Sequence, residues 1–295
     1  MDPTAITQTR RFNRTVVEQI GALSDRFLGR PRPMGESRAL WEIGPDGLEI
    51  RTLRTRLGLD SGYASRVLRA LERQGLVAVT ASPEDGRVRR AELTDAGRAE
   101  YAEINRRSDE VACNILQPLS QTQRERLVAA MAEVEHLLHA SMVRVTVEDP
   151  TSQDATWCLS QYYADLNTLF ETGFDVANGL PLPQQDMQPP TGLLMLARLR
   201  DRPIGCGAMK FEPNATVYLK RMWVAPEARG LGVGRRLLQA LEQHALEAGA
   251  RLAHLETNRA LQTAISLYRS AGYSEVPPFN DEYYAHHWFE KRLVP

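Results

Sequence analysis

Arg229-Gly230-Leu231-Gly232-Val233-Gly234-Arg235 joins a predicted strand over residues 217–224 to a predicted helix over residues 235–248. The first run is apolar and β-prone, and the second has apolar residues along one side, at Leu237, Leu238, Leu241 and Ala245. The N-terminus of a helix presents unpaired backbone N–H groups and a partial positive charge, and glycines let the backbone approach an anion closely. The stretch therefore predicts a phosphate-binding turn, without naming the ligand that carries the phosphate.

Three phosphate-binding patterns compete for this turn. A P-loop needs Gly-Lys-Ser/Thr, which the chain lacks. A dinucleotide fingerprint, G-x-G-x-x-G, needs a third glycine where Arg235 or Leu237 stands. Glu256 lies near the place of a ribose-binding acid, so spacing alone keeps the dinucleotide alternative open. The third pattern is R-x-x-G-x-G, and its fixed positions are matched by Arg229, Gly232 and Gly234.

The R-x-x-G-x-G turn and its flanks resemble the GNAT acetyltransferase superfamily. Lys220-Arg221-Met222-Trp223-Val224-Ala225-Pro226 leads into the turn as GNAT strands do, and residues 264–273 resemble the second coenzyme motif. Residues 284–291 resemble the last strand of many members that act on small molecules. The resemblance covers about residues 143–295 and implies an α/β fold with a mixed central sheet.

The resemblance implies direct transfer of an acetyl group from acetyl-CoA, as cosubstrate, to the amine of a small molecule, with no metal. It implies that the backbone of residues 222–224 pairs with the pantetheine arm and that the amides of residues 231–235 hold the pyrophosphate. It gives Tyr268 the role of the general acid that protonates the departing thiolate. The coenzyme-binding residues predicted in this way are Met222, Trp223, Val224, Arg229, Gly230, Leu231, Gly232, Val233, Gly234, Arg235, Asn258 and Tyr268.

Two positions depart from the GNAT pattern. The second coenzyme motif often begins with Asn three residues before its Ala, where this chain has Leu261, and Asn258 lies one turn earlier. We expect either that Asn258 takes over this coenzyme contact or that the contact is lost. The strand before the turn often carries a carboxylate near position 218, where this chain has Tyr218.

Because Tyr218 replaces the usual carboxylate, another residue must act as the general base. An amine has an unperturbed pKa of about 10 and must lose its proton during the reaction. Glu256, at the end of its predicted strand, is the first candidate for a catalytic base, acting directly or through water. Weaker candidates are His254, Glu212 and Tyr283.

The first half of the chain predicts two helices joined by a short turn. Apolar residues repeat at helical spacing from Ile50 to Leu57, Gly58 breaks the pattern, and Ser61 can cap the next helix. The second helix has a predicted buried side, formed by Ala64, Val67, Leu68 and Leu71. Another face carries Arg66, Arg69 and Arg73. Such a helix suits the major groove of DNA, where Arg bonds phosphates or guanine edges.

A basic hairpin is predicted after these helices. Two short apolar runs, residues 76–79 and 91–93, flank Asp85-Gly86, which is typical of a hairpin turn. The pattern is a winged helix-turn-helix, and together with Leu93-Thr94-Asp95-Ala96-Gly97-Arg98 it resembles the MarR family over about residues 5–140. The resemblance implies a homodimer that binds a double-stranded DNA operator. The predicted DNA-binding residues are Ser61, Tyr63, Ser65, Arg66, Arg69, Arg87 and Arg89.

A further helix is predicted from the capping box Ser120-Gln121-Thr122-Gln123. Its apolar stripe consists of Leu127, Met131, Val134 and Leu138. The stripe is either core packing within one subunit or the seam of a dimer, and only the resemblance favours the seam.

The composition limits the function classes. The net charge of −1 argues against a generic polyanion binder, although residues 51–73 hold six Arg against Asp60 and Glu72. The three cysteines are far apart, which indicates a reducing compartment and no disulfide framework or zinc spacing. No stretch approaches a membrane span, so we expect a cytoplasmic protein without a membrane partner.

The sequence therefore predicts two domains. Residues 1–142 form a mainly α, MarR-like winged helix for DNA binding and dimerisation, and residues 143–295 form a GNAT N-acetyltransferase. The predicted function is a bifunctional transcriptional regulator and acetyl-CoA-dependent N-acetyltransferase. One alternative is a DNA-binding regulator whose second domain senses acyl-CoA or an effector without turnover. Another is an enzyme whose first half only dimerises.

Overall fold

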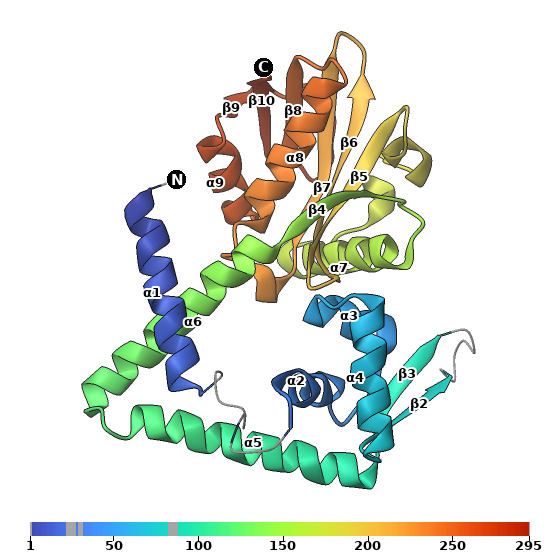
Figure 1. Cartoon of the computed structure of the whole chain (residues 1–295). Coiled ribbons are helices and arrows are strands. Elements are labelled where there is room, and N and C mark those ends of the chain that lie inside the picture. The colour runs from blue at the N-terminus through green and yellow to red at the C-terminus, as the bar shows by residue number, and fades with distance from the viewer. Residues whose placement is uncertain (1, 22–27, 29–31, 82–87, 295) are drawn as a thin grey trace. The chain divides into compact units, whose positions relative to one another are not determined.

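The computed structural model describes residues 2–21, 28, 32–81 and 88–294 (Figure 1). The chain divides into two compact units, Met1–Ala132 and Glu133–Pro295. The division falls inside helix α6 (Gln121–Met142), whereas the sequence places the boundary after residue 142. That domain boundary stays a prediction.

The first unit combines helices with a small antiparallel sheet, as its sequence predicts. Its helices besides α6 are α1 (Pro3–Gln19), α2 (Met34–Ile43), α3 (Ile50–Leu57), α4 (Ser61–Arg73) and α5 (Asp95–Leu116). Its strands lie in the order β1-β3-β2 and span Leu48–Glu49 (β1), Val77–Ala81 (β2) and Arg89–Leu93 (β3). Leu40 of α2, Leu53 of α3 and Leu71 of α4 are fully buried at its core.

The turn between α3 and α4 follows the predicted helix-turn-helix. Gly58 ends α3 in the left-handed conformation, with φ of 63°. The cap of α4 differs from the prediction, because Asp60 rather than Ser61 precedes the helix and its carboxylate accepts a hydrogen bond of 2.8 Å from the backbone N–H of Tyr63. Ser61 is instead the first residue of α4.

The second unit is built on a mixed sheet of seven strands in the order β4-β5-β6-β7-β8-β10-β9. All neighbouring strands are antiparallel except β7 and β8, which are parallel. The strands are Arg144–Glu148 (β4), Gly192–Leu199 (β5), Arg202–Glu212 (β6), Thr216–Val224 (β7), Leu252–Thr257 (β8), Ser274–Val276 (β9) and His287–Arg292 (β10). The edge strand β9 has only three residues, and no alternation of apolar and polar residues predicts it from the sequence.

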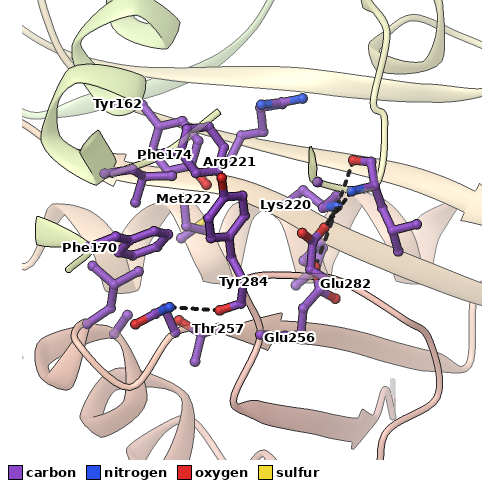
Figure 2. A pocket seen from close by; sticks show the side chains of 18 of the residues that line it. Tyr162, Phe170, Phe174, Lys220, Arg221, Met222, Glu256, Thr257, Glu282 and Tyr284 are labelled. Carbon is purple, nitrogen blue, oxygen red and sulfur yellow. Dashed lines mark hydrogen bonds and ion pairs between the residues drawn. The ribbon is translucent and has the colours of Figure 1, made fainter. Parts of the chain in front are cut away.

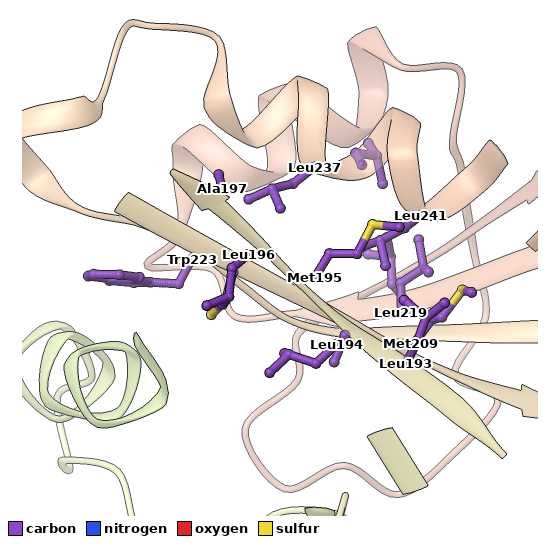
Figure 3. Close-up of a cluster of buried hydrophobic side chains, with 14 of the residues drawn as sticks. Leu193, Leu194, Met195, Leu196, Ala197, Met209, Leu219, Trp223, Leu237 and Leu241 are labelled. Carbon is purple, nitrogen blue, oxygen red and sulfur yellow. The ribbon is translucent and has the colours of Figure 1, made fainter. Parts of the chain in front are cut away.

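Besides the end of α6, the second unit has the α-helices α7 (Gln153–Leu169), α8 (Val233–Glu247) and α9 (Gln262–Ser270). Figure 3 shows Leu237 and Leu241 of α8 packed over one face of the sheet, while Leu194, Leu196 and Trp223 face the opposite side. The alternation along β5 fills both faces with apolar side chains, so the sheet is a rigid layer between helices. That layer holds the ends of β7 and β8 in place.

Candidate functional site

The central feature of the site is the separation of the two parallel strands. β7 and β8 pair only at Thr216 with Leu252, Val217 with Ala253 and Tyr218 with His254. Beyond Tyr218, β7 remains paired with β6, and beyond His254, β8 remains paired with β10. The two strands diverge from this point, and a cavity of about 100 Å³ lies between residues 219–222 and residues 256–258.

A β-bulge in β7 lies beside this cavity. Cys206 pairs with Trp223 and Ala208 with Lys220, so Gly207 stands opposite two residues, Arg221 and Met222. Arg221 has a positive φ of 59°, which is uncommon for a residue with a side chain. A Cβ on Gly207 would lie 2.6 Å from the sulfur of Met222, so the glycine makes room for the bulge. The bulge interrupts regular pairing where the sequence predicts backbone contact with a pantetheine arm.

The glycine turn lies between β7 and α8, as predicted. Gly232 precedes α8 in the left-handed conformation with φ of 72°, and a Cβ there would meet no atom within 4 Å. None of the described residues accepts a hydrogen bond from the backbone N–H groups of Gly232, Val233, Gly234 and Arg235. The N–H of Leu231 differs, since it donates to the carbonyl of Ala228. The turn thus offers four unpaired N–H groups at a helix N-terminus, which suits a phosphate.

Ion pairs and hydrogen bonds fix the turn to the rest of the unit. Asp165 of α7 accepts hydrogen bonds from Arg229 at 2.8 Å and from the indole of Trp223 at 3.0 Å. At the other end of the turn, Arg235 donates to the hydroxyl of Ser270 at 2.6 Å. These side chains hold the turn between α7 and α9 without closing off its N–H groups.

The cavity has one apolar wall rich in aromatic rings (Figure 2). Phe174 lies 5.9 Å from Phe170 and 4.9 Å from Tyr284, measured between ring centroids. Tyr162 and Leu180 also line the cavity. Phe174 and Leu180 belong to the segment between α7 and β5, which contains two short 3-10 helices, Val176–Asn178 and Gln184–Met187.

The cavity also contains a buried group of charged side chains. Glu256 accepts a hydrogen bond of 2.5 Å from the hydroxyl of Tyr218, and Asn280 lies 3.4 Å from its other oxygen. The ammonium of Lys220 lies 3.5 Å from Glu256 and 3.1 Å from Glu282. Figure 2 shows these three charged side chains directed toward one another.

Burial changes the acid–base properties of this group. It raises the pKa of Glu256, although the charge of Lys220 and the hydrogen bond from Tyr218 oppose that rise. Burial and the neighbouring Glu256 together raise the pKa of Tyr218 well above its usual range, so its hydroxyl remains a donor. A carboxylate with a raised pKa is a better proton acceptor than an exposed one.

Tyr268 of α9 lines the same cavity and is 5% exposed. Its hydroxyl makes no hydrogen bond with any described residue, and burial, with the charge of Glu256, raises its pKa. The hydroxyl is therefore protonated at neutral pH. The structure thus brings Tyr268 and Glu256, the two predicted catalytic residues, to one cavity.

Asn258 lies at the cavity too, but its side chain is already engaged. It donates a hydrogen bond of 2.7 Å to the carbonyl of Tyr284 and accepts one of 2.9 Å from the N–H of Ala260. Leu261, where the GNAT pattern has Asn, lies just before α9 and contributes no polar group. The coenzyme contact predicted for Asn258 stays a prediction.

The weaker base candidates lie elsewhere. The Nε2 atom of His254 lies 2.9 Å from a carboxylate oxygen of Glu212, outside the cavity lining, and Tyr283 is 67% exposed. Lys220, Glu282 and Tyr284 also line the cavity, although no sequence pattern marks them as site residues. Glu282 and Tyr284 come from the irregular connection before β10, where no periodicity marks a role, and they bind the backbone N–H groups of Leu180 and Asp175. They thereby tie two loops together over the cavity.

In the first unit, α4 presents the predicted DNA-binding side chains to solvent. Ser61, Tyr63, Ser65, Arg66 and Arg69 are exposed, while Ala64, Val67, Leu68 and Leu71 are buried. The guanidinium of Arg66 lies 5.6 Å from the ring centroid of Tyr63. Within the described residues, neither Arg66 nor Arg69 forms a salt bridge. Both are therefore available to an anionic partner.

The predicted wing is formed by β2 and β3, which pair from Val77 with Leu93 to Ala81 with Arg89. Arg89 is exposed, and Arg87 lies outside the described residues. Arg90 is turned back onto the fold, where it donates to the carbonyl of Gly47 and pairs with Glu92.

Two absences concern only the described part of the chain. It contains no cluster of three His, Cys, Asp or Glu side chains that could hold a metal ion, and the absence of a metal stays a prediction. None of its helices has both the length and the apolar character needed to cross a bilayer.

Two protein families match separate parts of the chain. The acetyltransferase (GNAT) family matches residues 159–273, and the MarR family matches residues 28–88. An uncharacterized N-acetyltransferase from Schizosaccharomyces pombe is 30% identical over 135 residues, which cover 45% of this chain and 83% of that protein. An IAA acetyltransferase from Azospirillum brasilense is 38% identical over 96 residues, which cover 32% of this chain and 63% of that protein.

Further similarities concern each half separately. An uncharacterized HTH-type transcriptional regulator from Bacillus subtilis is 26% identical over 91 residues, which cover 31% of this chain and 56% of that protein. The chain thus spans less than two thirds of the Azospirillum and Bacillus relatives. The crystal structure of a GNAT acetyltransferase from Staphylococcus aureus covers 52% of this chain and 99% of its own, with 17% identity and a TM-score of 0.44.

Proposed function

Because the chain belongs to the GNAT acetyltransferases and carries a MarR-family domain before its catalytic fold, we propose that it is both a DNA-binding transcriptional regulator and an acetyl-CoA-dependent N-acetyltransferase. The acceptor in this proposal is the amine of a small molecule. The observation that carries the proposal is the cavity between β7 and β8, which Glu256 and Tyr268 both line, together with the turn after β7 and its four unpaired N–H groups.

The unpaired N–H groups support binding of the coenzyme. In our proposal, residues 232–235 donate to the pyrophosphate of acetyl-CoA, and residues 222–224 pair with its pantetheine arm. The bulge at Arg221 and Met222 supports this placement, because it leaves the edge of β7 irregular where β8 has already moved away. Acetyl-CoA supplies the acetyl group as a thioester.

The buried carboxylate and hydroxyl support a proton path for acyl transfer. The amine nitrogen forms a bond to the thioester carbon, and Glu256 accepts the proton that the amine loses. The carbon–sulfur bond then breaks, and Tyr268 donates its proton to the leaving sulfur. Glu256 comes from β8 and Tyr268 from α9, and both line the cavity in which the proposed transfer takes place.

The exposed face of α4 supports the regulatory half of the proposal. Arg66 and Arg69 would contact phosphates or guanine edges in the major groove, and Arg89 would contact the adjacent backbone from the wing. We also propose a homodimer, because α1 and α6 leave apolar side chains exposed. These are Ile6, Phe12 and Val16 on α1, and Val128, Met131, Leu137, Leu138 and Met142 on α6. A cytoplasmic location is part of the same proposal.

The experiment that tests this function incubates the full-length protein with acetyl-CoA and a library of amines, and measures thiol release together with acetylated product. We expect release of thiol that depends on an amine. Binding of acetyl-CoA without transfer to any amine would instead favour the alternative of a regulator that senses the coenzyme without turnover. A duplex selection with the same protein tests the DNA-binding half separately.

A further inference from the structure

The cavity is divided between an aromatic end and a charged end. Phe170, Phe174 and Tyr284 contact one another, with centroid distances of 4.9 to 5.9 Å. Phe170 directly follows α7, Phe174 lies in the loop just after it, and Tyr284 lies in the connection before β10, so two segments far apart in the sequence converge at this end (Figure 2). A group of three rings at one end of the cavity favours a flat apolar ligand, since rings pair edge-to-face or offset with other rings.

The charged end carries one more negative than positive group when Glu256 is ionised. Lys220 is shared between Glu256 and Glu282, and the side chains of all three are at most 12% exposed. One oxygen of Glu282 accepts from the N–H of Leu180 and from Lys220, while its Oε1 accepts no hydrogen bond from any described residue. The triad therefore lacks one cation and one hydrogen-bond donor.

Arg221, the other cationic residue that lines the cavity, does not neutralise the charged end. The guanidinium of Arg221 lies 4.9 Å from the ring centroid of Tyr163 and donates to the carbonyl of Leu182. Arg221 is thus held against the far wall, away from Glu256 and Glu282. A carboxylate brought to the charged end would meet two glutamates and a lysine that is already shared.

From this division we infer the class of the acceptor, and the inference rests on the proposed function. We infer that the acceptor is a primary amine on an aromatic or similarly flat apolar group, without a carboxylate beside the amine. Its ring would lie against Phe170, Phe174 and Tyr284, and its ammonium would approach Glu282 before Glu256 takes the proton. The ammonium supplies the cation and the donor that the triad lacks.

Initial rates with the full-length protein and acetyl-CoA test this class. The panel is 2-phenylethylamine, n-butylamine, which lacks the ring, and phenylalanine, which adds a carboxylate. We expect kcat/KM for 2-phenylethylamine to exceed that of either other amine by about tenfold or more. Equal values for n-butylamine, a preference for phenylalanine, or no saturable rate with 2-phenylethylamine would overturn the inference.

A pair of substitutions assigns the preference to the rings. Phe174→Leu should lower the ratio of kcat/KM between 2-phenylethylamine and n-butylamine several-fold. Phe211→Leu is the matched control, because Phe211 packs against the core from β6 and does not line the cavity, and its ratio should stay at the wild-type value. An unchanged ratio in Phe174→Leu, or an equal loss in both variants, would overturn the aromatic subsite.

Glu282→Gln tests the charged end. Because it removes the negative charge, it should raise KM for 2-phenylethylamine more than it lowers kcat, and it should lessen the discrimination against phenylalanine. A fall in kcat larger than the rise in KM would overturn the proposed role of Glu282 in binding the ammonium. Calorimetric titration with acetyl-CoA separates the two claims: if the coenzyme binds but the amine preferences are absent, the acceptor class fails alone, whereas if the coenzyme does not bind, the proposed function fails with it.

Discussion

Tyr218 donates a hydrogen bond of 2.5 Å to Glu256, from the last residue at which β7 pairs with β8 to the carboxylate just beyond. Tyr218 stands where GNAT proteins often carry a carboxylate. The bond therefore links the position that lacks the usual acid to the carboxylate that we propose as its replacement. It also favours the ionised form of Glu256, against the effect of burial.

Tyr218→Phe should move the pH dependence of acetyl transfer upward. Loss of the hydroxyl removes a hydrogen bond that stabilises the ionised carboxylate, so the pKa of Glu256 should rise further. The rate at the acidic side should fall, and kcat/KM measured against pH reports the shift. Tyr273→Phe is the control, because Tyr273 is also buried but lies outside the cavity lining. A profile that coincides with wild type would remove Tyr218 from this role.

Glu256→Gln should change how the free energy of unfolding depends on pH. The pKa of Glu256 is raised in the folded protein from its ordinary value of 4.5, so the carboxyl stabilises the fold below that value and this stability is lost as pH rises through the raised pKa. The stability of the wild type relative to Glu256→Gln should thus decrease from acid toward neutral pH. Urea unfolding at several pH values measures the difference, and an increase with pH would contradict the burial argument.

Tyr268→Phe should slow turnover while leaving the affinity for acetyl-CoA and the fold nearly unchanged. Its hydroxyl makes no hydrogen bond with the described residues, so its removal costs no internal contact. Loss of a general acid lowers rates by about 10²- to 10⁴-fold. Single-turnover rates should show the decrease, and Tyr273→Phe, whose ring lies 5.9 Å from that of Tyr268, should not. Equal rates in Tyr268→Phe and wild type would show that another group protonates the sulfur.

Arg66→Ala combined with Arg69→Ala should weaken binding to a selected DNA duplex. Each lost phosphate contact should also reduce the slope of log K against log salt by about 0.9. Arg106→Ala serves as the control, because Arg106 lies on α5 and already pairs with Glu103. If the double variant keeps the wild-type salt dependence, α4 does not contact the DNA backbone through these residues.

Much of the fold was predictable because local patterns and tertiary packing agree. The helical spacing of apolar residues in α3 and α4, the capping box at Ser120 and the glycine turn each specify their element from a few neighbouring residues, and the structure follows them. The cap of α4 was wrong by one residue, because Asp60 and Ser61 are both good caps and only the backbone geometry decides between them. The edge strand β9 was not predicted, because it depends on pairing with β10, which no local sequence pattern specifies.

The site was predictable only in part. Glu256 and Tyr268 were found because one ends a strand and the other lies in a motif. Lys220 and Glu282 were not found, because their place in the site depends on an ion pair between residues 62 positions apart in the sequence. The bulge at Arg221 likewise depends on the register of β6 and β7, which no local pattern specifies.

Calorimetric titration of acetyl-CoA into Gly232→Glu and Gly249→Glu tests the central claim most directly. The two glycines lie at opposite ends of α8, both have positive φ, and a Cβ at either meets no atom within 4 Å, so both variants carry a similar backbone cost of about 1–2 kcal/mol. Only Gly232 places a negative charge beside the unpaired N–H groups. We expect Gly232→Glu to lose measurable binding while Gly249→Glu keeps the wild-type affinity. Wild-type affinity in a folded Gly232→Glu, or an equal loss in both variants, would contradict the assignment of this turn to the coenzyme pyrophosphate.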